Sequence, residues 1–98
     1  MWSKNASFES GVLHLAGIPA AQLAEEFGTP TFFLDEDAFK SRALAWNKGL
    51  HEEFGAHAGI IFYAAKSFIS TAVAQWIAEA GIGIDVCTGG ELAVALAG

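Results

Sequence analysis

Two consecutive stretches in the second half of the chain repeat one order, an apolar strand-like run followed by a helix-like run. The first pair is GIIFYAAK (59–66) with SFISTAVAQWIAEAG (67–81), and the second is GIGIDVCT (81–88) with GGELAVALAG (89–98). Near-continuous apolar strands joined by helices are typical of a parallel sheet whose two faces are both covered. The repeat therefore predicts the α/β class.

The first part of the chain predicts shorter elements. GVLHL (11–15) alternates as a short strand does, and IPAAQLAEEFG (18–28) has the pattern of a compact helix that Gly28 ends. TFFLD (31–35) follows a proline and predicts a second strand. We therefore expect strand, helix and strand before residue 36.

A longer helix is predicted from Glu36 to Phe54. Acidic residues lie at its positive N-terminal end, where they interact favourably with the helix dipole. Its apolar positions recur at helical spacing and define one face, formed by Phe39, Trp46, Leu50 and Phe54. The helix predicted over 67–81 has a similar face, formed by Ile69, Val73, Trp76, Ile77 and Ala80.

Composition excludes several classes of protein. Of the 98 residues, 53% are hydrophobic and 16% are charged, so a disordered chain is excluded. No apolar run is long enough to span a membrane, and the N-terminus lacks the apolar stretch of a signal peptide. The net charge of −6 disfavours nucleic acid and anionic membrane surfaces as partners.

The cysteine and histidine residues argue against disulfide and metal chemistry. The single cysteine, Cys87, cannot form a disulfide within the chain and fits a reducing compartment, so we expect a cytoplasmic protein. His14, His51 and His57 form no recognised ligand spacing with Cys87, and we expect no metal site.

Lys66 follows directly on a predicted core strand, although lysine is among the residues least often buried. In α/β folds, functional sites lie at the carboxyl ends of parallel strands, where Lys66 falls. Strand alternation places Phe62, Ala64 and Lys66 on one face, and the small Ala64 leaves room for a flat ring beside the lysine. Such an amine can form a Schiff base. Alternatively, the aliphatic part of the Lys66 side chain could pack on the strand end while its amine stays in water.

Asp85 interrupts the apolar run of the next predicted strand and shares a face there with Gly83 and Cys87. A carboxylate in a core-like strand needs a partner. If neighbouring strands carry Lys66 and Asp85 into one interior, each offsets the desolvation of the other. The alternative is a strand-end aspartate that is bonded to nearby backbone amides.

The turn Thr88-Gly89-Gly90-Glu91 predicts the start of the last helix. Thr88 is the expected N-cap, and Glu91 completes a capping box three residues later. Two glycines alone are weak support for a phosphate site. Cys87 is expected to be a small buried strand residue rather than a nucleophile.

These segments resemble one enzyme family. FYAAKSF, followed about 20 residues later by DVCTGGELAVALAG, looks like the start of the diaminopimelate decarboxylases, which are fold-type III, alanine-racemase-like enzymes that use pyridoxal 5′-phosphate (PLP). FGTPTFFLDED resembles the entry strand and first helix of that family, and the likeness covers residues 11–98. The YAAK motif is shared with ornithine and arginine decarboxylases, whereas DVCTGGEL points to the diaminopimelate branch.

The resemblance implies a fold and a set of residue roles. Residues 1–35 would join a β-domain, and residues 36–98 would begin a PLP-binding (β/α)8 TIM barrel that this chain leaves incomplete. Lys66 matches the lysine that holds PLP as a Schiff base, Ala64 the small residue beside the cofactor, and Asp85 the acid near the lysine and the ring. Ser67 stands where many members carry alanine.

The resemblance also implies a carboxy-lyase that converts meso-diaminopimelate, a small amino-acid substrate, to L-lysine and CO2 in the last step of lysine biosynthesis, acting as a homodimer. Several other parts of the family's site come from later strands or from the C-terminal domain. We therefore expect an N-terminal piece of the enzyme that is inactive alone. The alternatives are another fold-type III decarboxylase acting on arginine, ornithine or carboxynorspermidine, a non-catalytic truncated product, or an unrelated flavodoxin-like domain.

Overall fold

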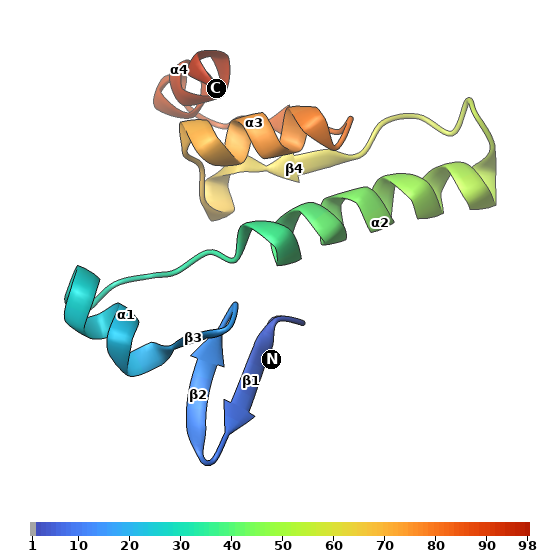
Figure 1. The fold of residues 1–98 in the computed structure, drawn as a ribbon. Coiled ribbons are helices and arrows are strands. Elements are labelled where there is room, and N and C mark those ends of the chain that lie inside the picture. Colours follow the sequence, from blue (N-terminus) through green and yellow to red (C-terminus); the bar gives the residue numbers. More distant parts are fainter. Residues whose placement is uncertain (1) are drawn as a thin grey trace. The chain divides into compact units, whose positions relative to one another are not determined.

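The computed structural model describes residues 2–98, which fall into two compact units divided between Phe39 and Lys40. The first unit opens with an antiparallel hairpin of β1 (Ala6–Glu9) and β2 (Val12–Leu15), and β2 also pairs with the short β3 (Ile18–Pro19) (Figure 1). Ser10 and Gly11 link β1 to β2 with φ values of 51° and 80°. A two-residue turn with φ positive at both positions matches the right-handed twist of a hairpin.

The helix of the first unit is shorter than expected. It was predicted over 18–28, but α1 spans Ala20–Phe27 because residues 18 and 19 pair with β2 as β3. Gly28 follows the helix with φ 82°, a conformation that glycine adopts without steric cost. Leu23 is the residue of α1 that is buried.

The strand predicted over residues 31–35 is wrong. These residues form no strand in the structure, and Phe32 is fully exposed. A strand requires a neighbour to accept and donate its backbone hydrogen bonds. The three-stranded sheet of this unit consists of β1, β2 and β3, so it leaves this β-prone segment without a ladder among the described residues.

The predicted long helix is confirmed with its bounds, because α2 spans Glu36–Phe54. Asp35 caps it, since its Oδ1 accepts a hydrogen bond from the Ala38 backbone N–H at 2.9 Å. The Asn5 side chain donates to Asp35 at 3.2 Å and to Asp37 at 2.9 Å. The hydrogen bond from Asn5, followed by the hydrogen bond and charge of Lys4, holds the pKa of Asp37 below its usual value.

In the second unit, one side of α2 packs against the end of α3 (Thr71–Glu79). Ala43 is buried, and the Asn47 side chain donates to the Ala80 carbonyl at 3.1 Å. Lys40 forms a 2.7 Å ion pair with Glu79. The packed side of α2 is therefore mostly small or polar.

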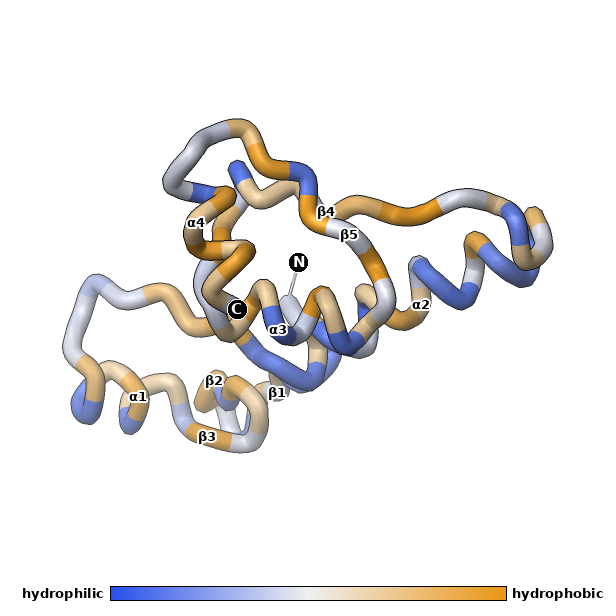
Figure 2. The backbone as a smooth tube through the Cα atoms, turned by 90° about the horizontal axis from the view of Figure 1, so that it is seen from above, coloured by the Kyte–Doolittle hydropathy of each residue, from blue (hydrophilic) through white to orange (hydrophobic). Residues whose placement is uncertain are grey.

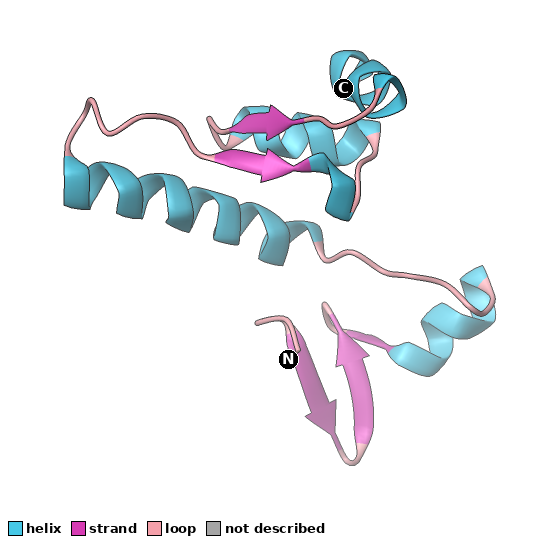
Figure 3. Cartoon of the chain, turned by 180° about the vertical axis from the view of Figure 1, so that it is seen from behind, coloured by secondary structure: helices cyan, strands magenta, loops and turns pink. Residues whose placement is uncertain are grey.

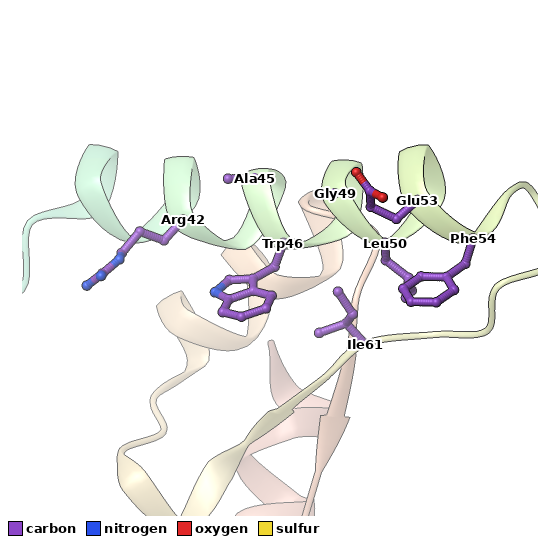
Figure 4. A pocket seen from close by; sticks show the side chains of 8 residues that line it. All are labelled: Arg42, Ala45, Trp46, Gly49, Leu50, Glu53, Phe54 and Ile61. Atoms are coloured by element: carbon purple, nitrogen blue, oxygen red, sulfur yellow. The ribbon is translucent and has the colours of Figure 1, made fainter.

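The expected apolar face of α2 is largely uncovered. Trp46 is 71% exposed and Phe54 is 75% exposed. With Leu50 and Ile61 they line an open groove of about 600 Å³ (Figure 4). The periodicity of this face is correct, but residues 40–98 bring nothing large enough to bury it.

The order of the predicted β/α repeat is confirmed as β4 (Phe62–Ala64), α3, β5 (Gly83–Asp85) and α4 (Gly89–Ala97), with β4 and β5 parallel (Figure 3). Each element is shorter than the stretch predicted for it, and α3 begins at Thr71 rather than at residue 67. The core lies on α3, where Val73 and Ile77 are fully buried. Ser70 caps α3 by accepting from the Val73 N–H at 3.2 Å. The predicted α/β class is correct, and the sheet formed by these two strands does not close into a barrel within residues 2–98.

Two further properties concern the described residues as a whole. Among the helices of residues 2–98, none is long and apolar enough to cross a membrane. The same residues contain no group of three or more His, Cys, Asp or Glu side chains that could hold a metal ion.

Candidate functional site

The carboxyl ends of β4 and β5 lie side by side. The parallel register pairs Phe62 with Gly83 and Ala64 with Asp85, each at the same level of the sheet. Both strands end there and lead into helical turns, the short 3-10 helix η1 (Ala65–Ser67) and, after a short loop, α4. Residues 64 and 85 therefore meet at the edge where α/β folds place their ligands.

The ring of Phe62 shows which residues share a face of this sheet. A Cβ atom added to Gly83 would lie 2.6 Å from two carbons of the Phe62 ring, so the ring lies over Gly83. Because side chains alternate along a strand, Ala64 and Asp85 project to that same face, one step further on. The structure thus brings Ala64 and Asp85 together.

Lys66 lies just beyond the strand, so strand alternation does not assign it to the face of Phe62 and Ala64. The strand ends at Ala64, and Lys66 is the middle residue of η1. A 3-10 helix turns by about 120° per residue, since it has three residues per turn, so the two-residue alternation of a strand stops before Lys66. The neighbouring Ala65 is buried, while Lys66 is exposed at the end of the strand.

A shared interior in which Lys66 and Asp85 offset each other was one of two alternatives for Asp85. Both are exposed, and no ion pair joins them within the described residues. The reason is physical: two strands leave both edges of the sheet uncovered, so no further strand encloses the space beside their carboxyl ends.

Two hydroxyl groups beside Lys66 were not identified from the sequence. Tyr63 Oη donates to the Phe68 carbonyl at 2.7 Å. Ser67 Oγ lies 2.8 Å from the Ala64 carbonyl and 3.1 Å from Tyr63 Oη. The sequence signal for this contact was the four-residue spacing of Tyr63 and Ser67 around the lysine. That spacing brings the two hydroxyls together only because the chain turns after Ala64.

The entry to α4 differs from the expected capping box in one bond. Thr88 is the N-cap, and its Oγ1 accepts from the Glu91 N–H at 3.1 Å. The Glu91 carboxylate accepts from the Cys87 N–H at 2.7 Å, one residue before the N-cap. Cys87 itself is exposed rather than buried, because β5 ends at Asp85 and residue 87 belongs to the loop.

Known proteins match this chain over nearly its whole length. The family model described as pyridoxal-dependent decarboxylase, pyridoxal binding domain, matches residues 36–98. The diaminopimelate decarboxylase of Mycobacterium tuberculosis is 50% identical over 97 residues, which cover 98% of this chain and 21% of that protein. The diaminopimelate decarboxylase of Bacillus subtilis is 35% identical over 92 residues, which cover 91% of this chain and 20% of that protein.

A solved structure has the same fold. It is the diaminopimelate decarboxylase of M. jannaschii in co-complex with L-lysine, which matches with a TM-score of 0.76 and 33% identity. The match covers 96% of this chain and 22% of that chain, so this chain spans about a fifth of the length of its relatives. With residues 36–98 in the pyridoxal binding domain, the chain belongs to the pyridoxal-dependent decarboxylases.

Proposed function

We propose that this chain supplies the cofactor-binding lysine of a PLP-dependent carboxy-lyase that converts meso-diaminopimelate to L-lysine and CO2. One observation carries the proposal: an exposed lysine amine follows the carboxyl end of β4, where Ala64 pairs in register with Asp85. The choice of substrate is supported by relatives named diaminopimelate decarboxylase at 50% and 35% identity.

The residues at this edge fit part of the cofactor. PLP has an aldehyde, a flat ring and a phosphate. The exposed Lys66 amine suits the aldehyde, and the methyl side chain of Ala64 leaves space for a ring. Asp85 lies on the same face as Ala64, so its carboxylate is beside the space for the ring. No cradle of buried amides for the phosphate accompanies these groups within residues 2–98, since the first turn of α4 is open and exposed.

Each residue has a distinct role in the proposed reaction. When bound, PLP supplies an electron-accepting ring that stabilises the charge left by loss of a carboxylate. Lys66 would hold the cofactor covalently through Nζ, and the same amine, when not so bonded, can hold or return a proton at that atom. Asp85 would place its carboxylate beside the ring, on the face that it shares with Ala64. Ala64 would keep the ring side of the site free of bulk.

The surrounding organisation is part of the proposal. Residues 1–35 would contribute to a β-domain, and residues 36–98 would start the PLP-binding (β/α)8 barrel. The uncovered edges of the β4–β5 sheet support further strands on either side. We infer that the complete enzyme is a homodimer. The exposed free thiol of Cys87 supports a reducing, cytoplasmic location.

The test is covalent trapping. The protein as its source produces it is incubated with PLP, reduced with borohydride, digested and analysed by mass spectrometry. We expect the label on Lys66. Lys48 is the internal control, because it is an exposed lysine on α2 that lies within 3.6 Å of Glu52 and outside the site.

The matched variants are Lys66→Ala and Lys48→Ala. The first should abolish both the label at residue 66 and the formation of lysine from meso-diaminopimelate, whereas the second should change neither. Full activity in Lys66→Ala would overturn the proposal. Higher activity on arginine or ornithine than on meso-diaminopimelate would leave the role of Lys66 unchanged and overturn the substrate assignment.

A further inference from the structure

We propose that Ser67 and Tyr63 form a positioning pair that fixes the backbone turn carrying Lys66. This inference rests on the proposed function, because it concerns how the amine of Lys66 is presented to the cofactor. The pair acts through the backbone on both sides of the lysine.

The turn that carries Lys66 is intrinsically weak. The helix η1 has three residues, and no side-chain cap supports its N-terminus at Ala64. The 3-10 geometry has poorer hydrogen bonds than an α-helix and is stable only in short pieces. Ala65 holds one side of the turn by burial, with 2% of its surface exposed. The exposed side, where Lys66 lies, needs another constraint.

The two hydroxyls supply that constraint. Tyr63 Oη donates to the Phe68 carbonyl at 2.7 Å. This bond links the next-to-last residue of β4 to the first residue after η1. A serine hydroxyl has one proton to donate, and the Ala64 carbonyl at 2.8 Å is its closer acceptor. When the proton of Ser67 points instead to Tyr63 Oη at 3.1 Å, the two hydroxyls form a chain that ends at Phe68.

Both arrangements close the backbone around Lys66. In the first, Ser67 donates to the Ala64 carbonyl across the lysine while Tyr63 donates to the Phe68 carbonyl. In the second, Ser67 donates to Tyr63 Oη, which is bonded to Phe68, and in neither arrangement does a bond use the lysine itself. Fixing the Cα position of Lys66 limits the volume that its long side chain can sample beside Ala64 and Asp85. A nucleophile held in a narrow range of positions reacts faster than one that must be ordered during the reaction.

The experiment measures the rate at which PLP is trapped at residue 66 in the protein as its source produces it. Ser67→Ala removes the hydroxyl, Ser67→Thr keeps it, and Tyr63→Phe removes the other hydroxyl while keeping the ring. Ser70→Ala is the matched control, because Ser70 caps α3 through its hydroxyl and lies outside the turn. Thermal unfolding is recorded for every variant, so that loss of stability is separated from loss of positioning.

We expect Ser67→Ala and Tyr63→Phe each to slow trapping about two- to tenfold, which is the rate equivalent of one hydrogen bond. Ser67→Thr should trap at the wild-type rate. Ser70→Ala should lower the melting temperature and leave trapping unchanged.

Three results would overturn the inference: an unchanged rate in both hydroxyl-deletion variants, an equal slowing in Ser70→Ala, or no recovery in Ser67→Thr. Should Ser67→Ala fail to fold, Tyr63→Phe decides the outcome. Failure of the underlying function has a different signature, because Lys66 would then remain unlabelled in the wild-type protein.

Discussion

Replacing Gly83 with alanine tests the register and the shared face on which the candidate site depends. Two opposing effects are expected. Gly83 lies in a strand and has no positive φ, so alanine is allowed there and should stabilise by about 0.4–1 kcal/mol through the unfolded state. The added Cβ, however, would lie 2.6 Å from two ring carbons of Phe62, so the ring must move. Overpacking in a well-packed core costs about 1–3 kcal/mol, and the 60% exposure of Phe62 places this case toward the lower end because the ring can turn away.

Because the steric cost of Gly83→Ala arises from the Phe62 ring, removing that ring should turn the substitution from destabilising to stabilising. In the wild-type background, Gly83→Ala should change the free energy of unfolding by between about 0 and −2.6 kcal/mol, the difference of the two ranges. In a Phe62→Ala background, the same change should raise it by about 0.4–1 kcal/mol. The coupling between the two positions is therefore about 1–3 kcal/mol.

The assay is urea unfolding of the four proteins of this cycle, followed by far-ultraviolet circular dichroism. Ile84→Val is a suitable control in both backgrounds, because residue 84 pairs with Tyr63 and projects to the opposite face. Additive effects of Gly83→Ala and Phe62→Ala would mean that the Phe62 ring does not lie over Gly83. The placement of Ala64 beside Asp85 on one face would then be wrong as well.

Two further predictions concern one residue in each unit. The pKa of Asp37 is lowered by Asn5 first and Lys4 second, so the stability that it contributes is complete above its unfolded pKa and is lost as pH falls through the folded value. Asn5→Ala and Lys4→Met should each raise the pKa of Asp37, as measured by NMR titration of its carboxyl carbon, and an unchanged pKa in both variants would contradict the assignment. Ala64→Leu should weaken PLP binding about tenfold or more, which a steric cost of about 1.4 kcal/mol produces, and leave the circular dichroism spectrum unchanged. Unchanged cofactor affinity would show that Ala64 does not lie beside the ring.

The β/α order was predictable because local pattern and packing agree there. The apolar positions of α3 recur at helical spacing, and the same residues, led by Val73 and Ile77, form the core. The bounds of α2 were predictable because Asp35 caps one end and Gly55, with φ 82°, follows the other. Capping and periodicity depend only on residues close together in the sequence, so both can be recognised from the sequence alone.

The failures all depend on partners that a local pattern cannot specify. Residues 31–35 have the composition of a strand, but a strand exists only where another one pairs with it. The strand β1 was missed because ASFE has only four residues and two apolar positions, and its pairing with β2 through the turn at Ser10 and Gly11 defines it. The face of Lys66 could not be read from strand alternation for a related reason, since alternation holds only within the strand and β4 ends two residues before the lysine.

The uncovered sheet also affects how this chain behaves in concentrated solution. The run Gly59–Ala65 carries no charge, and Figure 2 shows that the segment leading into β4 is hydrophobic. Ile60 and Phe62 are 66% and 60% exposed beside an unpaired strand edge. Exposed β-prone runs of this kind pair with copies of themselves, as in steric zippers. The net charge of −6 opposes that approach between molecules, and salt screens it over a Debye length of about 8 Å at physiological ionic strength. The chain therefore depends on its acidic surface for colloidal stability, and purification at high ionic strength removes that protection.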